Sequence, residues 1–326
     1  MAQVVVTGGG GFIGSHLIGA LLTRGDEVTV IDLCEDIPWR LSHLSGRGNL
    51  RYVAADVRDR QKCEEAIPGS CSKIFHLAAV VGVRNYCSDP LETIDTNIGG
   101  LRTILGAALL RGSKIIFAST SEVYGKNSKV PLGEDSDRVL GPTSIDRWSY
   151  GSSKAICEHM LFATHRKHSL PMVIVRLFNA YGPRQKPIFA IPAMIDEVVN
   201  GRGPRVYDSG EQTRCFTFAD DVIEGILRAS ERPLAEGQAF NIGSSQEITM
   251  ASLARKVIDV GGKSGELEPR FVDTKGIYRS YEDPSRRVPG VSRAKEVLGW
   301  AAKTSLDTGL RKTFEFVRME IDQERG

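Results

Sequence analysis

The sequence lacks what several classes of protein require. Its six cysteines are scattered and include no C-x-x-C pair, so neither a disulfide framework nor a zinc site is predicted, and reduced thiols in the cytoplasm are expected. An excess of charge of one sign is also absent, with 42 basic against 40 acidic residues. Such a balance produces no long-range field that would attract nucleic acid or an anionic membrane. We therefore predict a cytoplasmic protein with no bound metal and with neither nucleic acid nor a membrane as partner.

Long apolar runs and internal repeats are missing as well. No stretch reaches the roughly 18 apolar residues that a membrane-spanning helix needs. The first 23 residues contain no Lys or Arg, and glycines interrupt their apolar run, so they do not form a typical signal peptide. What remains is a chain of 326 residues, 41% hydrophobic and 25% charged, which is long enough to bury a core without covalent cross-links.

Short β-branched runs alternate with helical periodicity in the first half of the chain. Gln3–Thr7 is predicted to be a strand and Phe12–Thr23 a helix. The strands are apolar throughout, which is typical of a parallel sheet covered on both faces, so we predict an α/β fold with a doubly wound parallel sheet. Further strands are predicted at Glu27–Asp32, Leu50–Ala55, Lys73–Leu77, Lys114–Ser119 and Met172–Arg176, and long helices at Pro90–Leu110 and Tyr150–Arg166.

The composition changes after about Arg176, where Gly and Pro become frequent and the predicted elements become shorter. We expect a Rossmann domain at 1–177, rejoined by elements near 212–246, and a smaller lobe formed mainly by 178–326. Because ligands of such sheets lie beyond the carboxyl ends of the strands, the lobe is expected to cover the substrate. Helices of this part are predicted near Ile191–Asn200, Asp220–Ser230, Met250–Gly261 and Ser292–Leu298.

A glycine-rich loop joins the first strand to the first helix. Gly8, Gly11 and Gly14 follow the spacing G-x-x-G-x-x-G, which suits a tight turn, a close approach of the backbone to a diphosphate, and close packing of helix on strand. The free amides at the start of the helix attract an anion. The loop therefore predicts a dinucleotide cofactor.

Two acidic residues follow the next strands. Asp32 ends the second strand, where a carboxylate can accept the ribose hydroxyls of NAD and would repel the extra phosphate of NADP. No Arg stands in the three residues after it, so NAD is the predicted cofactor. Asp56 occupies a similar position after the third strand, where it either contacts the adenine or caps a helix.

Tyr150 and Lys154 stand four residues apart on a predicted helix, so both project from one face. A free tyrosine has a pKa of about 10 and is a poor base at neutral pH, but a neighbouring ammonium would stabilise its phenolate. Lys154 could also hold the nicotinamide ribose. Thr120, at the end of a strand, could share a hydrogen bond with a substrate hydroxyl and Tyr150. The three residues are predicted to be catalytic.

These motifs occur together with others along most of the chain. They are TGGGGFIGSHL from residue 7, DVRD from 56, HLAA from 76, STSEVYG from 119, RWSYGSSK from 147, RLFNAYGPR from 176, QTRCFTFADD from 212, FNIG from 240 and RRVPGVSRAKEVLGW from 286. Together they resemble the extended short-chain dehydrogenases/reductases, in the group of nucleotide-sugar epimerases, dehydratases and decarboxylases.

The resemblance implies contacts for the cofactor and for a nucleotide-sugar substrate, with a UDP-sugar favoured. Asn179, Arg214 and Arg287 match positions that contact the diphosphate, for which guanidinium groups are well suited. Tyr207 either stacks on the base or packs in the lobe. Cofactor contacts are implied at Phe12, Ile13, Val57 and Ala78.

The resemblance also implies the reaction, which begins when carbon 4 of the sugar is oxidised to a ketone. Glu122 matches a residue that discriminates among the members, and dehydratases have an aspartate before it, where this chain has Ser121. The Ser-Glu pair resembles UDP-glucuronate decarboxylases, and Tyr86 matches the sugar-binding loop of UDP-xylose synthases. We predict decarboxylation of UDP-glucuronate, with a nucleotide-sugar 4-epimerase as the alternative and a dehydratase ranking below both.

A different class of protein remains open at this point, namely a non-catalytic sensor that binds a dinucleotide and regulates a partner. Such proteins typically lose the tyrosine or the lysine, and this chain has both. The resemblance further implies a homodimer formed through a four-helix bundle of Pro90–Leu110 and Tyr150–Arg166, whose small residues either allow that contact or pack within the chain.

Overall fold

A seven-stranded parallel sheet forms the centre of the computed structural model, which describes residues 1–273 and 284–325. The strand order is β11-β6-β5-β4-β1-β2-β3, and every neighbouring pair is parallel. This confirms the predicted doubly wound fold. The strands are β1 (Gln3–Thr7), β2 (Glu27–Asp32), β3 (Leu50–Ala54), β4 (Lys73–His76), β5 (Lys114–Thr120), β6 (Met172–Leu177) and β11 (Gln238–Ile242).

The chain reverses direction across the sheet between β1 and β4. From β1 it moves outward to β2 and β3, and from β4 it moves the other way to β5 and β6. Thr7 at the end of β1 lies beside His76 at the end of β4, and the Thr7 hydroxyl is 2.7 Å from His76 Nδ1. The crevice beyond such a reversal is where ligands of doubly wound sheets bind.

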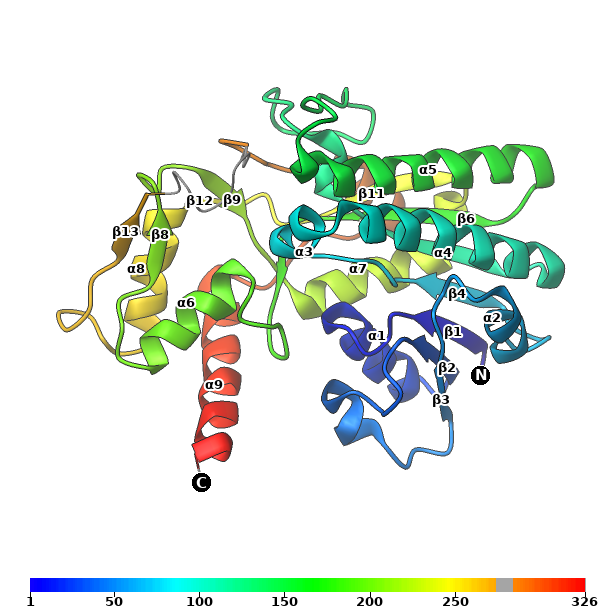
Figure 1. Ribbon diagram of the computed structural model, residues 1–326, viewed down its shortest axis with the longest axis horizontal. Coiled ribbons are helices and arrows are strands. Elements are labelled where there is room, and N and C mark those ends of the chain that lie inside the picture. Colours follow the sequence, from blue (N-terminus) through cyan, green and yellow to red (C-terminus); the bar gives the residue numbers. More distant parts are fainter. Residues whose placement is uncertain (274–283, 326) are drawn as a thin grey trace.

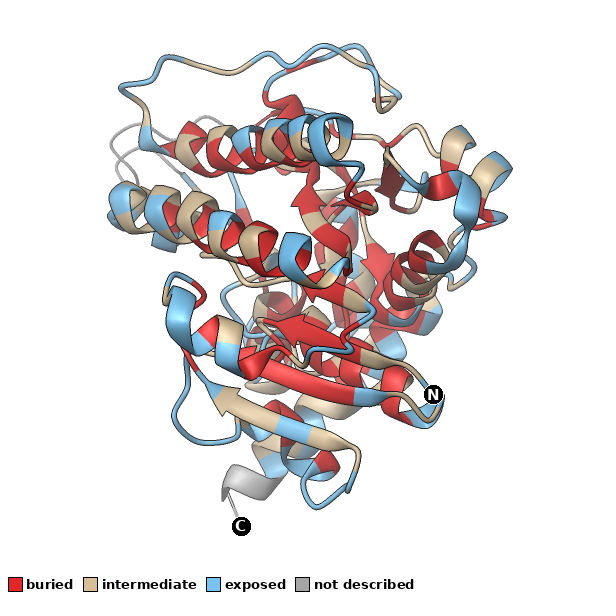
Figure 2. Cartoon of the chain, turned by 90° about the vertical axis from the view of Figure 1, so that its right-hand side faces the viewer, coloured by how far each residue is buried: buried red, intermediate tan, exposed pale blue. Residues whose placement is uncertain are grey.

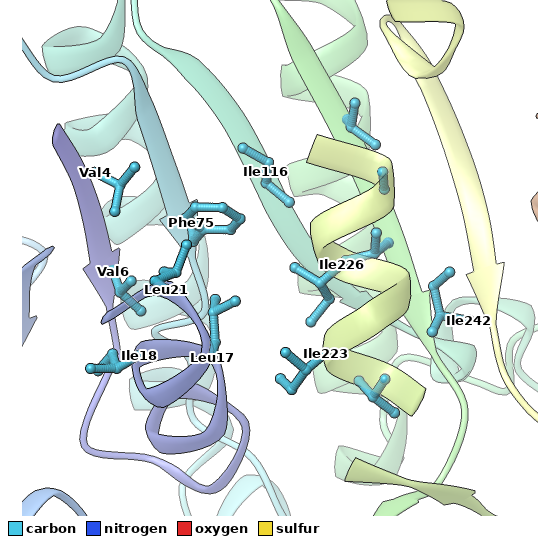
Figure 3. Packing of buried hydrophobic residues seen from close by; sticks show 14 of the residues in the cluster. Val4, Val6, Leu17, Ile18, Leu21, Phe75, Ile116, Ile223, Ile226 and Ile242 are labelled. Atoms are coloured by element: carbon cyan, nitrogen blue, oxygen red, sulfur yellow. The ribbon is translucent and has the colours of Figure 1, made fainter. Parts of the chain in front are cut away.

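Helices cover both faces of this sheet (Figure 1). Alternate residues of a strand point to opposite faces, so Val4 and Val6 pack against α1 and α7 while Val5 packs with α2, α4 and α5. Figure 3 shows Leu17 and Ile226 of the first layer directed toward the strands. The covering helices are α1 (Phe12–Thr23), α2 (Arg60–Ala66), α4 (Pro90–Arg111), α5 (Ser149–His168) and α7 (Ala219–Glu231).

Burial follows this layering. In Figure 2 the central strands are buried along most of their length, whereas the helices are buried on the side that faces the sheet. Both neighbours of β1 and of β5 are strands, which explains why residues such as Val5, Val6, Ile115 and Ile116 have no exposed surface. The apolar strand sequences are therefore a consequence of two-sided covering.

A second hydrophobic cluster lies in the C-terminal part, away from the sheet, and includes Ile195, Leu253, Val257 and Leu310. Its helices appear on the left of Figure 1 beside the short strands β8 and β13. Its elements are β7 (Ala180–Tyr181), α6 (Ala190–Val199), β8 (Arg205–Tyr207), β9 (Thr213–Cys215), β10 (Thr217–Phe218), β12 (Glu247–Thr249), α8 (Met250–Val260), β13 (Arg270–Val272) and α9 (Leu306–Arg325).

Short elements connect these layers. None of the helices in the part of the chain that the structure describes is long and apolar enough to cross a membrane. The connecting elements are the helix α3 (Val83–Ser88), the 3₁₀ turns η1 (Trp39–Leu44), η2 (Ser121–Tyr124), η3 (Asp146–Trp148) and η4 (Pro233–Ala235), and a π-helical turn η5 (Ala294–Leu298).

The predicted strands and helices all occur, with ends that differ by at most two residues. Several elements have no individually predicted counterpart, including α2, α3 and the short strands of the C-terminal part, and β11 and α9 are two of them. β11 contains the first three residues of the FNIG motif and joins the sheet by pairing with β6. α9 is amphipathic but charged, and its apolar residues Leu310 and Phe314 join the C-terminal cluster. The pairing of β11 with β6 and the packing of α9 on the C-terminal cluster determine these two elements more than their local sequences do.

Candidate active site

The glycine loop leaves no room for side chains. Gly8 has a φ of +69°, and a Cβ atom there would lie 2.6 Å from the Ala78 backbone nitrogen. A Cβ at Gly14 would lie 2.5 Å from the Gly8 carbonyl oxygen. Gly11 is the N-cap of α1, and Phe12 and Ile13 are its first two residues. The free amides of this helix start therefore stand at the crevice, which is the arrangement that a diphosphate requires.

Asp32 and Asp56, the two predicted contacts of the adenosine, have different hydrogen-bond partners. Asp32 accepts hydrogen bonds from the Gly10 and Leu33 amides, at 2.8 Å each, so its carboxylate supports the glycine loop. Asp56 instead pairs with Arg58 at 2.6 Å. The alternative that Asp56 caps a helix is wrong, because Asp59 accepts the capping bond of α2. The helix begins three residues later than that alternative requires.

Val57 follows Asp56 and turns away from it into the core. It is buried in the cluster under α4, where a Cβ at Gly100 would lie 2.6 Å from its Cγ2 atom. Ala78, on the other side of the crevice, donates its amide to the Thr7 hydroxyl at 3.4 Å. Ala78 and the glycine loop thus face each other across the ends of β1 and β4.

Tyr150 and Thr120 come together at the carboxyl end of β5. Both are nearly buried, and a hydrogen bond from the Thr120 side chain lowers the pKa of Tyr150 in part. Burial and the charge of Glu122 act in the opposite direction and prevail, so the pKa of Tyr150 lies above its ordinary value. In this state the phenol is protonated at neutral pH.

Lys154 lies one turn beyond Tyr150 and is 2% exposed. Its ammonium donates to the Ala118 carbonyl at 2.8 Å and stands 4.6 Å from the centre of the Phe117 ring. Burial lowers the pKa of Lys154 to about 8. The expectation that Lys154 lowers the pKa of Tyr150 is not met here, because the ammonium is directed at the end of β5 and the pKa of the phenol is raised.

Glu122 lies between two arginines. Its Oε2 atom is 2.7 Å from an Arg147 nitrogen, and its Oε1 atom accepts a hydrogen bond from Arg287. Burial alone would raise the pKa of Glu122, but the charges of Arg287 and Arg147 and their hydrogen bonds outweigh burial and hold it well below the usual range. Glu122 is therefore an anion at neutral pH, and it is a weak base as long as both arginines hold it.

The sequence predicts a binding role for Arg287 but none for Arg147. Arg287 is predicted to bind a diphosphate, but here its guanidinium holds Glu122, and its buried Nε has no hydrogen-bond partner among the residues that the structure describes. Arg147 was not among the predicted site residues. The signal that could have identified it is its place three residues before Tyr150, which corresponds to one helical turn.

Tyr86 reaches the site from α3 and is 3% exposed. Its ring stacks on that of Tyr150, with the centroids 5.2 Å apart and the planes at 6°. The Arg147 guanidinium lies 5.5 Å from the centre of the same ring. The residue predicted to contact the sugar thus also contacts the predicted base.

The remaining predicted substrate residues line β5 and the C-terminal part. Ser121 is buried directly before Glu122. Asn179, with a φ of +35°, donates to the Cys215 carbonyl at 2.9 Å, and Arg214 donates to the Thr213 carbonyl at 2.7 Å. Asn179 and Arg214 therefore meet at β9.

Tyr207 is the last residue of β8, the strand that precedes β9 in the chain. Its side chain is 45% exposed, so it is not a packed aromatic of the lobe. An exposed ring on a strand end is free to stack on a planar group.

The chain is similar to known proteins along almost its whole length. A family model described as GDP-mannose 4,6 dehydratase matches residues 5–313. UDP-N-acetyl-alpha-D-glucosaminuronate decarboxylase of Bacillus cytotoxicus is 36% identical over 99% of both chains, and UDP-glucuronic acid decarboxylase 2 of Arabidopsis thaliana is 33% identical over 99% of this chain and 70% of that protein.

Solved structures agree. The crystal structure of UDP-glucuronic acid 4-epimerase from Bacillus cereus, in complex with UDP-glucuronic acid and NAD, is 28% identical with a TM-score of 0.86 and covers 98% of this chain and 99% of that one. The motifs, the fold and these similarities agree, and the chain belongs to the GDP-mannose 4,6 dehydratase family of nucleotide-sugar enzymes, within the extended short-chain dehydrogenases/reductases.

Proposed function

We propose that the chain is an NAD-dependent enzyme that removes the carboxylate of UDP-glucuronate, or of a close UDP-uronate, through a 4-keto sugar. The observation that carries this proposal is Glu122, an anion beside Tyr150 that two arginines hold in place. Two relatives with at least 33% identity bear the names of UDP-uronate decarboxylases. Ser121 stands where a dehydratase would need an acid for the leaving hydroxyl.

The glycine loop fits a dinucleotide. The cradle formed by Gly8, Gly14 and Ala78 would be filled by a single added Cβ atom, and Asp32 stands at the end of β2 beside it. We propose that these residues hold NAD, with Gly11, Phe12 and Ile13 at the diphosphate. Bound NAD would supply a reversible acceptor for the hydrogen of carbon 4.

The chain's own residues then handle protons and charge. Once its phenol is ionised, Tyr150 accepts the proton of the 4-hydroxyl, while Thr120 orients that hydroxyl and Lys154 adds a positive charge one turn further along α5. With a ketone at carbon 4, the carbon 6 carboxylate belongs to a β-keto acid. The bond from carbon 5 to the carboxylate breaks, carbon dioxide leaves, and the electron pair moves onto the ketone oxygen, which becomes an enolate. A proton from water then adds to carbon 5 and re-forms the ketone. Carbon 4 would regain its hydrogen from the reduced cofactor, and its oxygen would regain the proton held by Tyr150, which gives the UDP-pentose.

Substrate binding is assigned to the residues around this centre. We propose that Tyr86 and Ser121 contact the sugar, Asn179 and Arg214 the diphosphate, and Tyr207 the base. Arg287 would exchange its bond with Glu122 for one with the substrate as the substrate binds, since its buried Nε has no partner in residues 1–273 and 284–325.

The decisive experiment is incubation of the purified protein with UDP-glucuronate and, in parallel, with its 2-acetamido counterpart. Release of carbon dioxide and formation of a UDP-pentose are expected from at least one of the two. An intact carboxylate with inverted carbon 4 would instead establish the second candidate, a 4-epimerase, which the likeness to the Bacillus cereus epimerase favours.

We also propose a homodimer through α4 and α5. Leu91, Leu110 and Ile156 on these helices expose 72%, 69% and 46% of their surface. Among the small residues of α4, Gly100 and Ala107 are buried within the chain and serve internal packing, whereas a Cβ atom added at Gly106 would meet nothing within 4 Å. Sedimentation velocity on the wild-type protein and on Leu110→Glu would test the dimer, and a wild-type monomer would contradict it.

Two broader assignments remain proposals. We assign 1–177 to a Rossmann domain, rejoined by elements near 212–246, and 178–326 mainly to a sugar-binding lobe. The separate C-terminal cluster and the pairing of β11 with β6 support this division. A cytoplasmic location is supported by six free cysteines.

A further inference from the structure

Arg147 is a buried cation in a position that joins two parts of the site. It lies in η3 (Asp146–Trp148), which leads directly into α5, and it is 2% exposed. Tyr150 follows one helical turn later. A guanidinium is costly to bury, so its place needs a specific reason.

The contacts of Arg147 supply that reason. Its guanidinium is 2.7 Å from the Glu122 carboxylate and 5.5 Å from the centre of the Tyr86 ring. Tyr86 stacks on Tyr150, and Glu122 lies close enough to Tyr150 for its charge to act on the phenol. Arg147 thus contacts two of the residues beside the phenol, Glu122 and Tyr86.

We propose that Arg147 is a positioning residue for proton transfer at Tyr150, because it holds Glu122 and Tyr86 in place against the phenol and compensates the charge of Glu122. This inference rests on the proposed function, in which Tyr150 takes the proton of the sugar hydroxyl. It adds a residue that the motifs do not assign to that step.

The charges around the phenol give the sign of the effect. Glu122 from η2 opposes a negative phenolate, as does the Cys157 thiol on α5 when ionised, while the Thr120 hydroxyl favours the phenolate by hydrogen bonding. Two cations lie nearby. Lys154 is on the next turn of α5, and Arg287 pairs with the Oε1 atom of Glu122, whereas Arg147 pairs with Oε2. Without Arg147, the part of the Glu122 charge that it compensates is left unbalanced, and the phenolate becomes harder to form.

The test compares Arg147→Met with Arg147→Lys in the NAD-loaded enzyme. We expect single-turnover oxidation of UDP-glucuronate, followed as reduced nicotinamide, to shift its pH profile toward alkaline pH by about one unit in the Met variant. The rate at pH 7 then falls about tenfold and recovers as the pH rises. KM should change less than threefold, and Lys, which keeps the charge, should restore most of the wild-type profile.

Loss of packing alone would lower the rate at every pH without moving the profile. A second experiment introduces Arg147→Met into the Glu122→Gln variant, in which no carboxylate needs compensation. There the alkaline shift caused by Arg147→Met should be less than half of the shift that it causes in the wild-type background. An unmoved profile in Arg147→Met, or an equal shift in both backgrounds, overturns the inference.

Failure of the proposed function is distinguished by a measurement that needs no turnover. Tyrosinate absorbance near 295 nm, taken as the difference from Tyr150→Phe, reports ionisation of the phenol in the holoenzyme. Arg147→Met should ionise at higher pH than wild type even if no uronate is consumed. Ionisation at the same or lower pH in the variant would refute the role of Arg147, whatever the substrate proves to be.

Discussion

At the scale of single residues, the proposed chemistry depends on ionising a buried phenol. Burial and the charge of Glu122 raise the pKa of Tyr150, and the hydrogen bond of the Thr120 side chain acts in the opposite direction. The phenol therefore needs the charges that arrive with ligands before it can act as a base.

Replacement of Tyr150 by Phe should abolish turnover and leave NAD binding intact. The ring and its stacking on Tyr86 are kept, and only the hydroxyl is lost. General-base catalysis contributes about 10²- to 10⁴-fold, so a loss of at least that size is expected. Product formation and calorimetric NAD binding measure the two effects. Preserved activity would refute the assigned base.

Lys154 should make stability depend on pH in a defined window. Its pKa is about 8 in the folded chain against 10.5 in a free side chain, so between these values the unfolded state binds more protons, and the free energy of unfolding rises with pH. Relative to Lys154→Met, the wild type should gain up to about 3 kcal/mol from pH 8 to 10.5. Urea unfolding at both pH values measures this gain; a constant difference would contradict it.

At the scale of elements, the junction of β1 and α1 fixes the cofactor site. The helix starts close against the strand because Gly14 has only a hydrogen where another residue would have Cβ. The same helix contains Gly19, whose added Cβ would meet nothing within 4 Å. The two glycines therefore have different physical roles in one helix.

Gly14→Ala should destabilise the protein by about 1–3 kcal/mol, because its Cβ would overlap the Gly8 carbonyl. NAD affinity should fall with it, since the loop must move. Gly19→Ala is the matched control and should be neutral or stabilising by up to about 1 kcal/mol, the helix preference of Ala over Gly. Thermal unfolding with and without NAD compares them, and equal behaviour of the two variants would count against a steric role for Gly14.

At the scale of the whole molecule, a buried polar network joins the sheet to its covering helix and to the loop above it. Arg176 on β6 pairs with Glu158 on α5 at 2.6 Å and donates to the Tyr124 hydroxyl at 2.8 Å. Tyr124 in turn donates to Asn241 on β11 at 2.7 Å, and Ser119 on β5 donates to Glu158 at 2.5 Å. Five elements, namely β5, β6, β11, α5 and η2, therefore share one network beneath the site.

Arg176→Met should cost about 3–5 kcal/mol of folding free energy, because it leaves the Glu158 carboxylate buried without its cation. The double variant Arg176→Met with Glu158→Met should lose clearly less than the sum of the single losses, since it removes both charges. Denaturant unfolding of the four proteins gives the coupling energy. Additive losses would show that the pair is not coupled.

The order of the early strands and helices follows from local sequence, because apolar runs and glycine spacing are local properties. β1, α1 and β2 have the predicted bounds, and Tyr150 and Lys154 share a helix as their spacing requires. β11 and α9 could not be assigned in this way, because each is defined by the surface it covers. The direction of the Lys154 ammonium likewise depends on where β5 ends.

The sequence by itself therefore determined the doubly wound fold, the glycine cradle and the set of chemical groups available for catalysis. Only the tertiary structure decided how their charges combine. Arg287 is 165 residues from Glu122 in the chain and binds the same carboxylate as Arg147. Electrostatic interactions depend on distance in space and on burial, and neither is encoded by spacing along the chain. The ionisation of Glu122 and the raised pKa of Tyr150 thus arise only when the chain is folded.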